Sequence, residues 1–165
     1  MAIDVSAAFR WIVVTPRGPG HFINGLVVTD NAFRVVNGSV ERVEMVDDSF
    51  ATLDFGRMRN VTFDANAFHA VSQFTVSPLI MEHVQTTPAD TWVVSPGPFM
   101  PFGGRARAVS GLVPEGPIQS GSNVTQFAQP HVLVEQGTAR NQVHVRWPSA
   151  VRGRVMITIR TDNPT

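Results

Sequence analysis

Residues 142–147 read QVHVRW and residues 154–160 read RVMITIR, and both segments alternate apolar with polar side chains. This period of two is typical of a strand that buries one face, because successive side chains of a strand point to opposite sides. The join at residues 148–153 is short and contains a proline and a glycine, which favour a turn. We therefore predict an antiparallel hairpin, with Trp147 on its apolar face.

Other short segments are also rich in β-branched and aromatic residues. On this basis we expect strands at residues 9–14, 25–29, 32–36, 40–46, 51–55, 60–63, 73–77, 105–109, 124–127 and 131–135. Many short strands with frequent turn signals are typical of an antiparallel β-sandwich or barrel. We therefore expect an all-β fold with at most one short helix, which a capping residue and an apolar stripe favour at residues 64–71. Residues 30–31 form a plausible turn between two strands, and we identify no internal repeat.

The length of 165 residues predicts a single β domain, residues 1–165. Proline and glycine recur between residues 86 and 123, and the proline-rich part at 95–104 is incompatible with a central strand. We therefore expect an extended loop or arm at about residues 86–123. Connections of this length in compact domains are usually functional or disordered.

Composition excludes several kinds of chemistry. The chain has no cysteine, and all 13 basic residues are arginine, so thiolate metal sites, cysteine nucleophiles and lysine Schiff bases are ruled out. The five histidines lie far apart in the sequence, without the spacing of a common metal motif: His21, His69, His83, His131 and His144. No serine lies in a nucleophile-elbow pattern. We therefore expect no catalytic residues, no metal site and no cofactor, and we expect that the protein is not an enzyme.

The net charge is zero, but charge is unevenly distributed along the chain. Residues 1–90 hold six arginines against ten acids, and residues 91–165 hold seven arginines against three acids. Halves of opposite net charge favour head-to-tail pairing of neighbouring copies, unless folding intermixes the charges. A pI of about 7.0 argues against nucleic acid as a partner. We find no run of apolar residues long enough for a membrane-spanning helix, and the start at Met1–Asp4 lacks the basic and apolar regions of a signal peptide.

Two groups of residues are candidates for contacts with a partner. Phe99, Met100 and Phe102 lie on the proline-stiffened segment, which either folds back over its own core or projects as an arm into another chain. The hairpin carries four arginines, and we expect these to form salt bridges with a neighbouring subunit: Arg146, Arg152, Arg154 and Arg160.

In its overall features the chain resembles structural proteins of tailed-phage virions, of the head-decoration (cement) or tail type. Those features are its small size, lack of cysteine, many short strands, absence of a signal peptide and the proline- and glycine-rich segment at 95–104. The resemblance rests on no specific motif, so no family residues are carried over. It implies a virion protein made in the host cytoplasm, a homo-oligomer that binds other copies of itself and other assembly subunits. Two alternatives remain: a β-sandwich module that binds a ligand such as a carbohydrate through Trp11, Trp92 or Trp147, and a small β-barrel enzyme.

Overall fold

A computed structural model describes residues 9–163 of the chain, so the predicted absence of a signal peptide at Met1–Asp4 lies outside the described residues. Strands account for about half of the structure, which confirms the all-β prediction. The helices in the described part are three single 3₁₀ turns, η1 (Phe55–Arg57), η2 (Gly97–Phe99) and η3 (Pro101–Gly103). Neither these turns nor any other described segment forms a helix of the length and apolarity that a bilayer crossing requires.

The chain forms two compact units rather than the single unit expected. Unit 1 contains residues 9–78, 98–104 and 161–163 of the described chain, and unit 2 contains residues 79–97 and 105–160. Each unit is therefore assembled from more than one segment. The reason is that residues 98–104 and the C-terminal residues pack with the first half of the chain, although they follow strands of the second unit.

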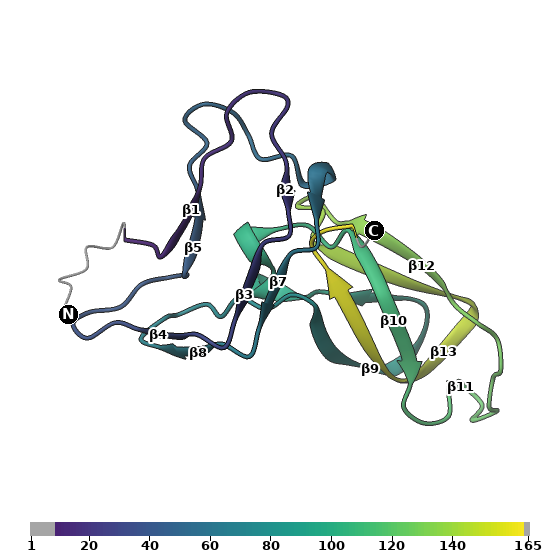
Figure 1. Cartoon of the computed structure of the whole chain (residues 1–165). Helices are drawn as coiled ribbons and strands as arrows, with labels where there is room; N and C mark the ends of the chain where they lie inside the picture. The colour runs from purple at the N-terminus through teal and green to yellow at the C-terminus, as the bar shows by residue number, and fades with distance from the viewer. Residues whose placement is uncertain (1–8, 164–165) are drawn as a thin grey trace. The chain divides into compact units, whose positions relative to one another are not determined.

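Unit 1 consists of eight short strands that pair in parallel. The first four are β1 (Ile12–Val14), β2 (Ile23–Asn24), β3 (Val27–Thr29) and β4 (Ala32–Arg34). The next four are β5 (Glu44–Val46), β6 (Met58–Arg59), β7 (Thr62–Asp64) and β8 (Ala67–His69). In chain order, each strand of the first set pairs with one of the second, β1 with β5 through to β4 with β8 (Figure 1). The chain thus makes two stacked coils, and the antiparallel pairing predicted for this part is wrong.

A sequence repeat underlies the stacking. Residues 25–34 read GLVVTDNAFR and residues 60–69 read NVTFDANAFH, and the register aligns them residue for residue, as in the pair Ala32 and Ala67. The two segments share the tripeptide Asn-Ala-Phe at a spacing of 35 residues. Sequence analysis overlooked this repeat because so few of the ten positions are identical, while a solenoid coil needs only matching corners and inward-facing apolar residues.

The corners explain two incorrect predictions. Asp30 and Ala65 both have left-handed backbone conformations, with φ of 58° and 52°, and each turns the chain from one strand into the next. Asp30 therefore ends β3 at a coil corner rather than in a hairpin. Residues 64–71, predicted as a helix, instead form the end of β7, the corner and β8. Stacking on the first coil outweighs the local helix signals in this segment.

Asparagine side chains connect the two coils at this corner. The Asn31 backbone N–H donates to Asn66 Oδ1 at 3.0 Å, and Asn66 Nδ2 donates to the Val28 carbonyl at 2.8 Å. Stacked amides of this kind satisfy backbone groups that the corner leaves without a strand partner.

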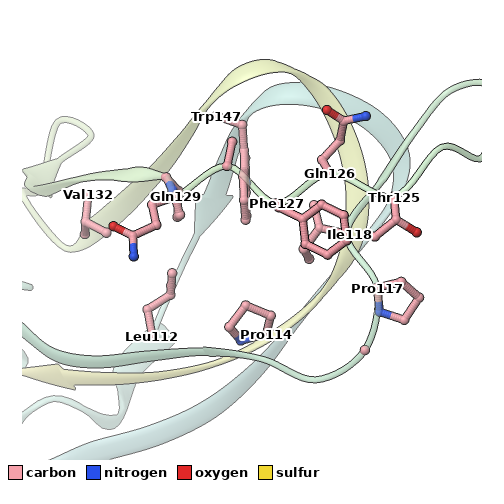
Figure 2. A pocket seen from close by; sticks show the side chains of 13 residues that line it. Leu112, Pro114, Pro117, Ile118, Thr125, Gln126, Phe127, Gln129, Val132 and Trp147 are labelled. Atoms are coloured by element: carbon pink, nitrogen blue, oxygen red, sulfur yellow. The ribbon is translucent and has the colours of Figure 1, made fainter.

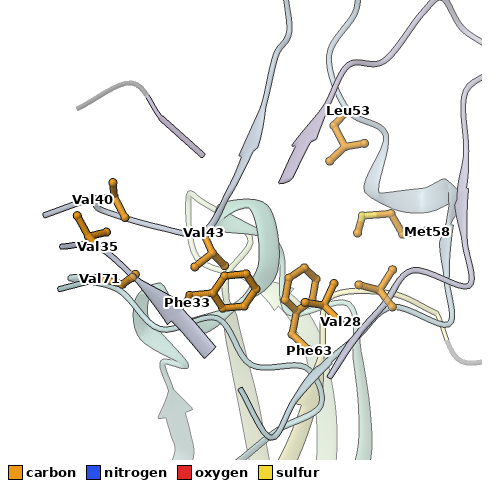
Figure 3. Packing of buried hydrophobic residues seen from close by; sticks show 10 residues of the cluster. Val28, Phe33, Val35, Val40, Val43, Leu53, Met58, Phe63 and Val71 are labelled. Carbon is orange, nitrogen blue, oxygen red and sulfur yellow. The ribbon is translucent and has the colours of Figure 1, made fainter. Parts of the chain in front are cut away.

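The core of unit 1 lies inside the coils. Figure 3 shows inward-facing side chains from both coils packed together, among them Phe33 and Phe63. The ring of Phe33 also stacks on that of Phe68, its neighbour in the register, with centroids 5.7 Å apart. The buried members of this cluster are Val28, Phe33, Val35, Val40, Val43, Leu53, Met58, Val61, Phe63 and Val71.

Unit 2 is an antiparallel sheet arranged around one long strand. It contains β9 (Leu79–Val94), β10 (Ala108–Pro114), β11 (Gln119–Ser120), β12 (His131–Gln136) and β13 (Gln142–Arg160), and β13 pairs with each of the others. Because β9 and β10 occupy much of residues 86–123, this segment is not the long connection predicted. The predicted hairpin is also wrong, since residues 142–160 form a single strand.

The predicted turn is instead an irregular part of β13. The pairing of β13 with β9 shifts in register between Arg146 and Val151 and again before Gly153. Gly153 has a φ of +156°, and a Cβ at this position would lie 2.7 Å from Ile118 Cδ1. A proline and a glycine can therefore mark a bulge where a strand changes direction as well as a turn. The alternation itself is confirmed, because Trp147 is buried together with Val143 and Val145.

Candidate interaction surfaces

The expected partner-binding segment folds back on unit 1. Met100 is only 1% exposed, and Phe102 packs against the core cluster, with its ring 6.2 Å from that of Phe63. Phe99 is 39% exposed, and its carbonyl accepts a hydrogen bond from the Val76 backbone. The prediction of a projecting arm is therefore corrected, because two of its three apolar side chains already have partners within their own unit.

A buried ion pair secures this segment. Glu44 is 1% exposed, and its carboxylate lies 2.8 Å from an Arg42 guanidinium nitrogen. The same carboxylate accepts hydrogen bonds from Thr75 Oγ1 at 2.6 Å and from the Phe102 backbone N–H at 3.1 Å. Arg42 also donates to the carbonyls of residues 98 and 100. The charges of Arg42 and Glu44 thus compensate each other within a hydrogen-bond network that holds residues 98–102 on unit 1.

The four candidate arginines of β13 do not form one basic stripe. Arg146 is exposed, and no ion pair with it is found within residues 9–163. Arg152 donates to Asn123 Oδ1, and Arg160 is half-buried. Arg154 lies 3.2 Å from a Glu82 oxygen and 3.7 Å from a Glu115 oxygen. The four side chains therefore differ in their surroundings, and Arg154 belongs to the apolar surface described next.

One face of the sheet formed by β9, β13 and β10 carries exposed apolar side chains. The register places Met156 of β13 between Glu82 of β9 and Val113 of β10. Ile80 and Val84, two residues on either side of Glu82, point to the same side and are 64% and 54% exposed, while Val113 is 59% exposed. We call this surface the outer face and define it by Ile80, Glu82, Val84, Val113, Glu115, Arg154 and Met156.

Both signs of charge lie on the outer face. Arg154 forms ion pairs with Glu82, which lies between Ile80 and Val84 on β9, and with Glu115. Because these side chains are 38–53% exposed, the pairs contribute little to stability on their own. Arg154 nevertheless presents a hydrogen-bond donor, and Glu82 and Glu115 present acceptors, to any surface that covers the sheet.

The outer face was missed by sequence analysis, although a signal was present. Residues 79–84 read LIMEHV, which is apolar at positions that face both sides of a strand. Such a pattern is typical of a strand covered on both faces. In the structure, one side of this segment faces the interior of unit 2 and the other side lies open.

Unit 2 also contains a pocket of about 520 Å³. Its walls come from β10, the segments on either side of β11, Val132 of β12 and Trp147 of β13. Figure 2 shows Leu112 and Pro114 on one side, and Trp147 with Phe127 and Gln129 on the other. This volume falls in the range of pockets that hold small molecules.

The charge asymmetry of the sequence persists in the folded units. The described residues of unit 1 hold six arginines against eight acids, and those of unit 2 hold seven arginines against four acids. Folding therefore does not intermix the charges of the two halves, and unit 1 is acidic while unit 2 is basic.

Within residues 9–163, no three His, Asp or Glu side chains lie close enough together to hold a metal ion. His83 has a lowered pKa because burial disfavours its charged form, and a hydrogen bond with Gln85 opposes this shift. Its ring lies 5.9 Å from that of the buried Trp92, on the interior side of β9.

Searches against protein-family models, curated proteins and solved structures return no match to this chain.

Proposed function

We propose that this protein is a structural subunit that assembles with further copies of itself and acts through contacts between subunits. The observation that carries the proposal is the outer face of unit 2, where Ile80 and Val84 of β9 and Val113 of β10 lie exposed on either side of the half-buried β13 residue Met156. Single exposed apolar residues are common on proteins, but a contiguous group of them marks an interaction site.

The charges favour another copy of the chain as the partner. The outer face holds Arg154 between two glutamates, so a second outer face offers complementary groups when it is turned through a two-fold rotation. An acidic unit 1 and a basic unit 2 add a second complementary pair of surfaces between copies.

Unit 1 offers a further supporting observation. In the described part of the chain, strands β1–β4 pair only with the second coil, so their other edges have no backbone partner. Solenoids usually cap such edges or extend them with another repeat. An edge of this kind suits a protein that works inside an assembly.

We assign the assembly, as the finer part of this proposal, to a tailed-phage virion, with the protein as a head-decoration or tail component. The overall resemblance of the chain to such proteins supports this part. The site supports the carbohydrate-binding alternative less well, because sugar stacking needs an exposed aromatic platform. Trp92 is fully buried, Trp147 is 6% exposed and Trp11 is partly buried.

The proposal is tested by the mass of the purified protein in solution. We expect light scattering after size-exclusion chromatography to give an oligomer, and we expect Val113→Lys to shift it to a smaller species. A lysine is well solvated on an exposed strand face, but it is costly to bury in an interface without a partner.

Val36→Lys is the matched control, since Val36 is 60% exposed in unit 1 and Val113 is 59% exposed in unit 2. The control variant should keep the wild-type mass. A wild-type protein that is monomeric at the highest soluble concentration contradicts the proposal, and so does a Val113→Lys variant of unchanged mass.

A further inference from the structure

The pocket of unit 2 is lined without a single charged side chain. Its lining is made of aliphatic, aromatic, proline and small residues together with the three polar side chains of Thr125, Gln126 and Gln129. An ionised ligand would lose hydration on entry and find no opposite charge there. The lining therefore selects for an uncharged ligand.

The walls favour flat, apolar groups. Trp147 lines the pocket, although it is only 6% exposed, and its ring centroid lies 5.1 Å from that of Trp92. Three prolines and Ile118 supply further apolar surface: Pro114, Pro117 and Pro130. Aromatic and proline rings present rigid faces, on which another ring packs with little loss of conformational freedom.

The rim carries an aromatic side chain that has almost no contacts of its own. Phe127 is 93% exposed and belongs to the segment of residues 121–130, which contains no strand or helix. A phenylalanine in this position gains burial when a ligand fills the space beside it. Phe127 can therefore close over an occupant without disturbing the sheet.

One residue that lines the pocket carries a buried polar atom without a partner. Trp147 Nε1 is buried and makes no hydrogen bond within residues 9–163. An unpaired buried N–H is costly, and most such groups in native proteins are satisfied.

We propose that this pocket is a binding site for an uncharged, mainly apolar small molecule that contains a flat ring system. This function is separate from assembly through the outer face, because the pocket is built from other residues. The volume, the uncharged lining and the exposed Phe127 beside it each support the same ligand class.

The test uses two dyes that share one ring skeleton. N-phenylnaphthylamine is neutral, and anilinonaphthalene sulfonate carries a negative charge on the same rings. We expect the neutral dye to bind the full-length protein saturably, with one dye per chain, and to quench tryptophan emission. The sulfonated dye should bind about tenfold more weakly or worse, because burial of a sulfonate is uncompensated in this lining.

Two variants locate the dye. Val132→Glu places a carboxylate on the pocket wall and should abolish saturable binding of the neutral dye, whereas Val134→Glu, two residues along the same strand and outside the lining, should preserve it. Phe127→Ala changes an exposed residue without risk to folding and should weaken binding several-fold. Thermal unfolding of both Glu variants identifies any loss of structure.

Three results overturn the proposal: no saturable binding of the neutral dye, equal affinity for both dyes, or unchanged binding in both Val132→Glu and Phe127→Ala. The proposal is also overturned if the affinity for the dye falls as the protein concentration rises and if Phe127→Ala restores that affinity. Phe127 of a second copy then occupies the pocket. Val113→Lys separates the two proposals, since a variant with a lost subunit contact should still bind the dye.

Discussion

Arg42 and Glu44 lie only two residues apart, yet together they fix a segment more than fifty positions later in the chain. The carboxylate of Glu44 accepts hydrogen bonds from the guanidinium of Arg42, the hydroxyl of Thr75 and the backbone N–H of Phe102. Arg42 in turn binds the carbonyls of Pro98 and Met100. This network explains why the proline-rich segment belongs to unit 1.

The first prediction concerns this network. Glu44→Gln keeps the size of the side chain but leaves the Arg42 guanidinium buried without its counter-charge, 11% exposed. We expect a loss of about 3–5 kcal/mol in the free energy of unfolding, as is typical when one partner of a buried pair is removed. Urea denaturation measures the loss.

Glu41→Gln provides the control for this prediction. Glu41 forms an ion pair with Arg10 at 3.7 Å, but its side chain is 59% exposed. Its removal should change stability by less than about 1 kcal/mol. Equal effects of the two substitutions would show that burial of the Arg42–Glu44 pair is not what fixes the segment.

The second prediction concerns the irregular part of β13. Gly153→Ala adds a Cβ where φ is +156° and where Ile118 Cδ1 lies 2.7 Å away. We expect a destabilisation of about 1–3 kcal/mol from backbone strain, together with displacement of Ile118. Because Ile118 lines the pocket, the neutral dye should bind more weakly in this variant as well.

Gly121→Ala is a suitable control for Gly153→Ala, since a Cβ at Gly121 makes only an ordinary contact of 3.7 Å with Pro88. Its stability and dye binding should stay close to those of the wild type. A wild-type melting temperature in Gly153→Ala would contradict the role assigned to this glycine.

The third prediction concerns the stacked coils of unit 1. Asn66→Ala removes the acceptor of the Asn31 backbone N–H and the donor to the Val28 carbonyl. We expect a loss of about 1–3 kcal/mol, because each hydrogen bond contributes about 0.5–1.5 kcal/mol. Hydrogen exchange should become faster in β3, β4, β7 and β8, while exchange in unit 2 should not change.

The fourth prediction concerns pH. The pKa of His83 is lowered in the folded protein because burial penalises the imidazolium, so the unfolded chain binds a proton more readily. The contribution of the neutral His83 side chain to the free energy of unfolding is therefore complete above the ordinary histidine pKa of 6.5. It is lost as the pH falls below that value. Urea denaturation at about pH 7.5 and about pH 5.5 should show the lower stability in acid.

His83→Phe keeps a ring next to Trp92 and removes the titration, so it should reduce the loss of stability in acid. His131→Gln changes an exposed histidine and should leave that loss as it is in the wild type. If both variants lose as much stability as the wild type, His83 is not the group responsible.

Local residue patterns predicted the all-β character and the buried face of the C-terminal segments, but not every strand: the predicted strands at residues 51–55, 73–77 and 124–127 are absent, and β9 was not predicted. The alternation in residues 142–147 and 154–160 correctly predicted that Trp147, Val155, Ile157 and Ile159 face inward. This works because a strand's period of two is a property of adjacent residues, independent of the strand's partners.

The sequence by itself determined an all-β chain without cysteine or lysine chemistry, with acidic and basic halves. Only the tertiary structure decided which strands pair, because pairing depends on residues far apart and on corners such as Asp30, where weak local preferences are overridden. For the same reason the outer face and the pocket were not predicted. Each brings together side chains from separate strands, such as Ile80, Val113 and Met156, whose common surface exists only once the register is set.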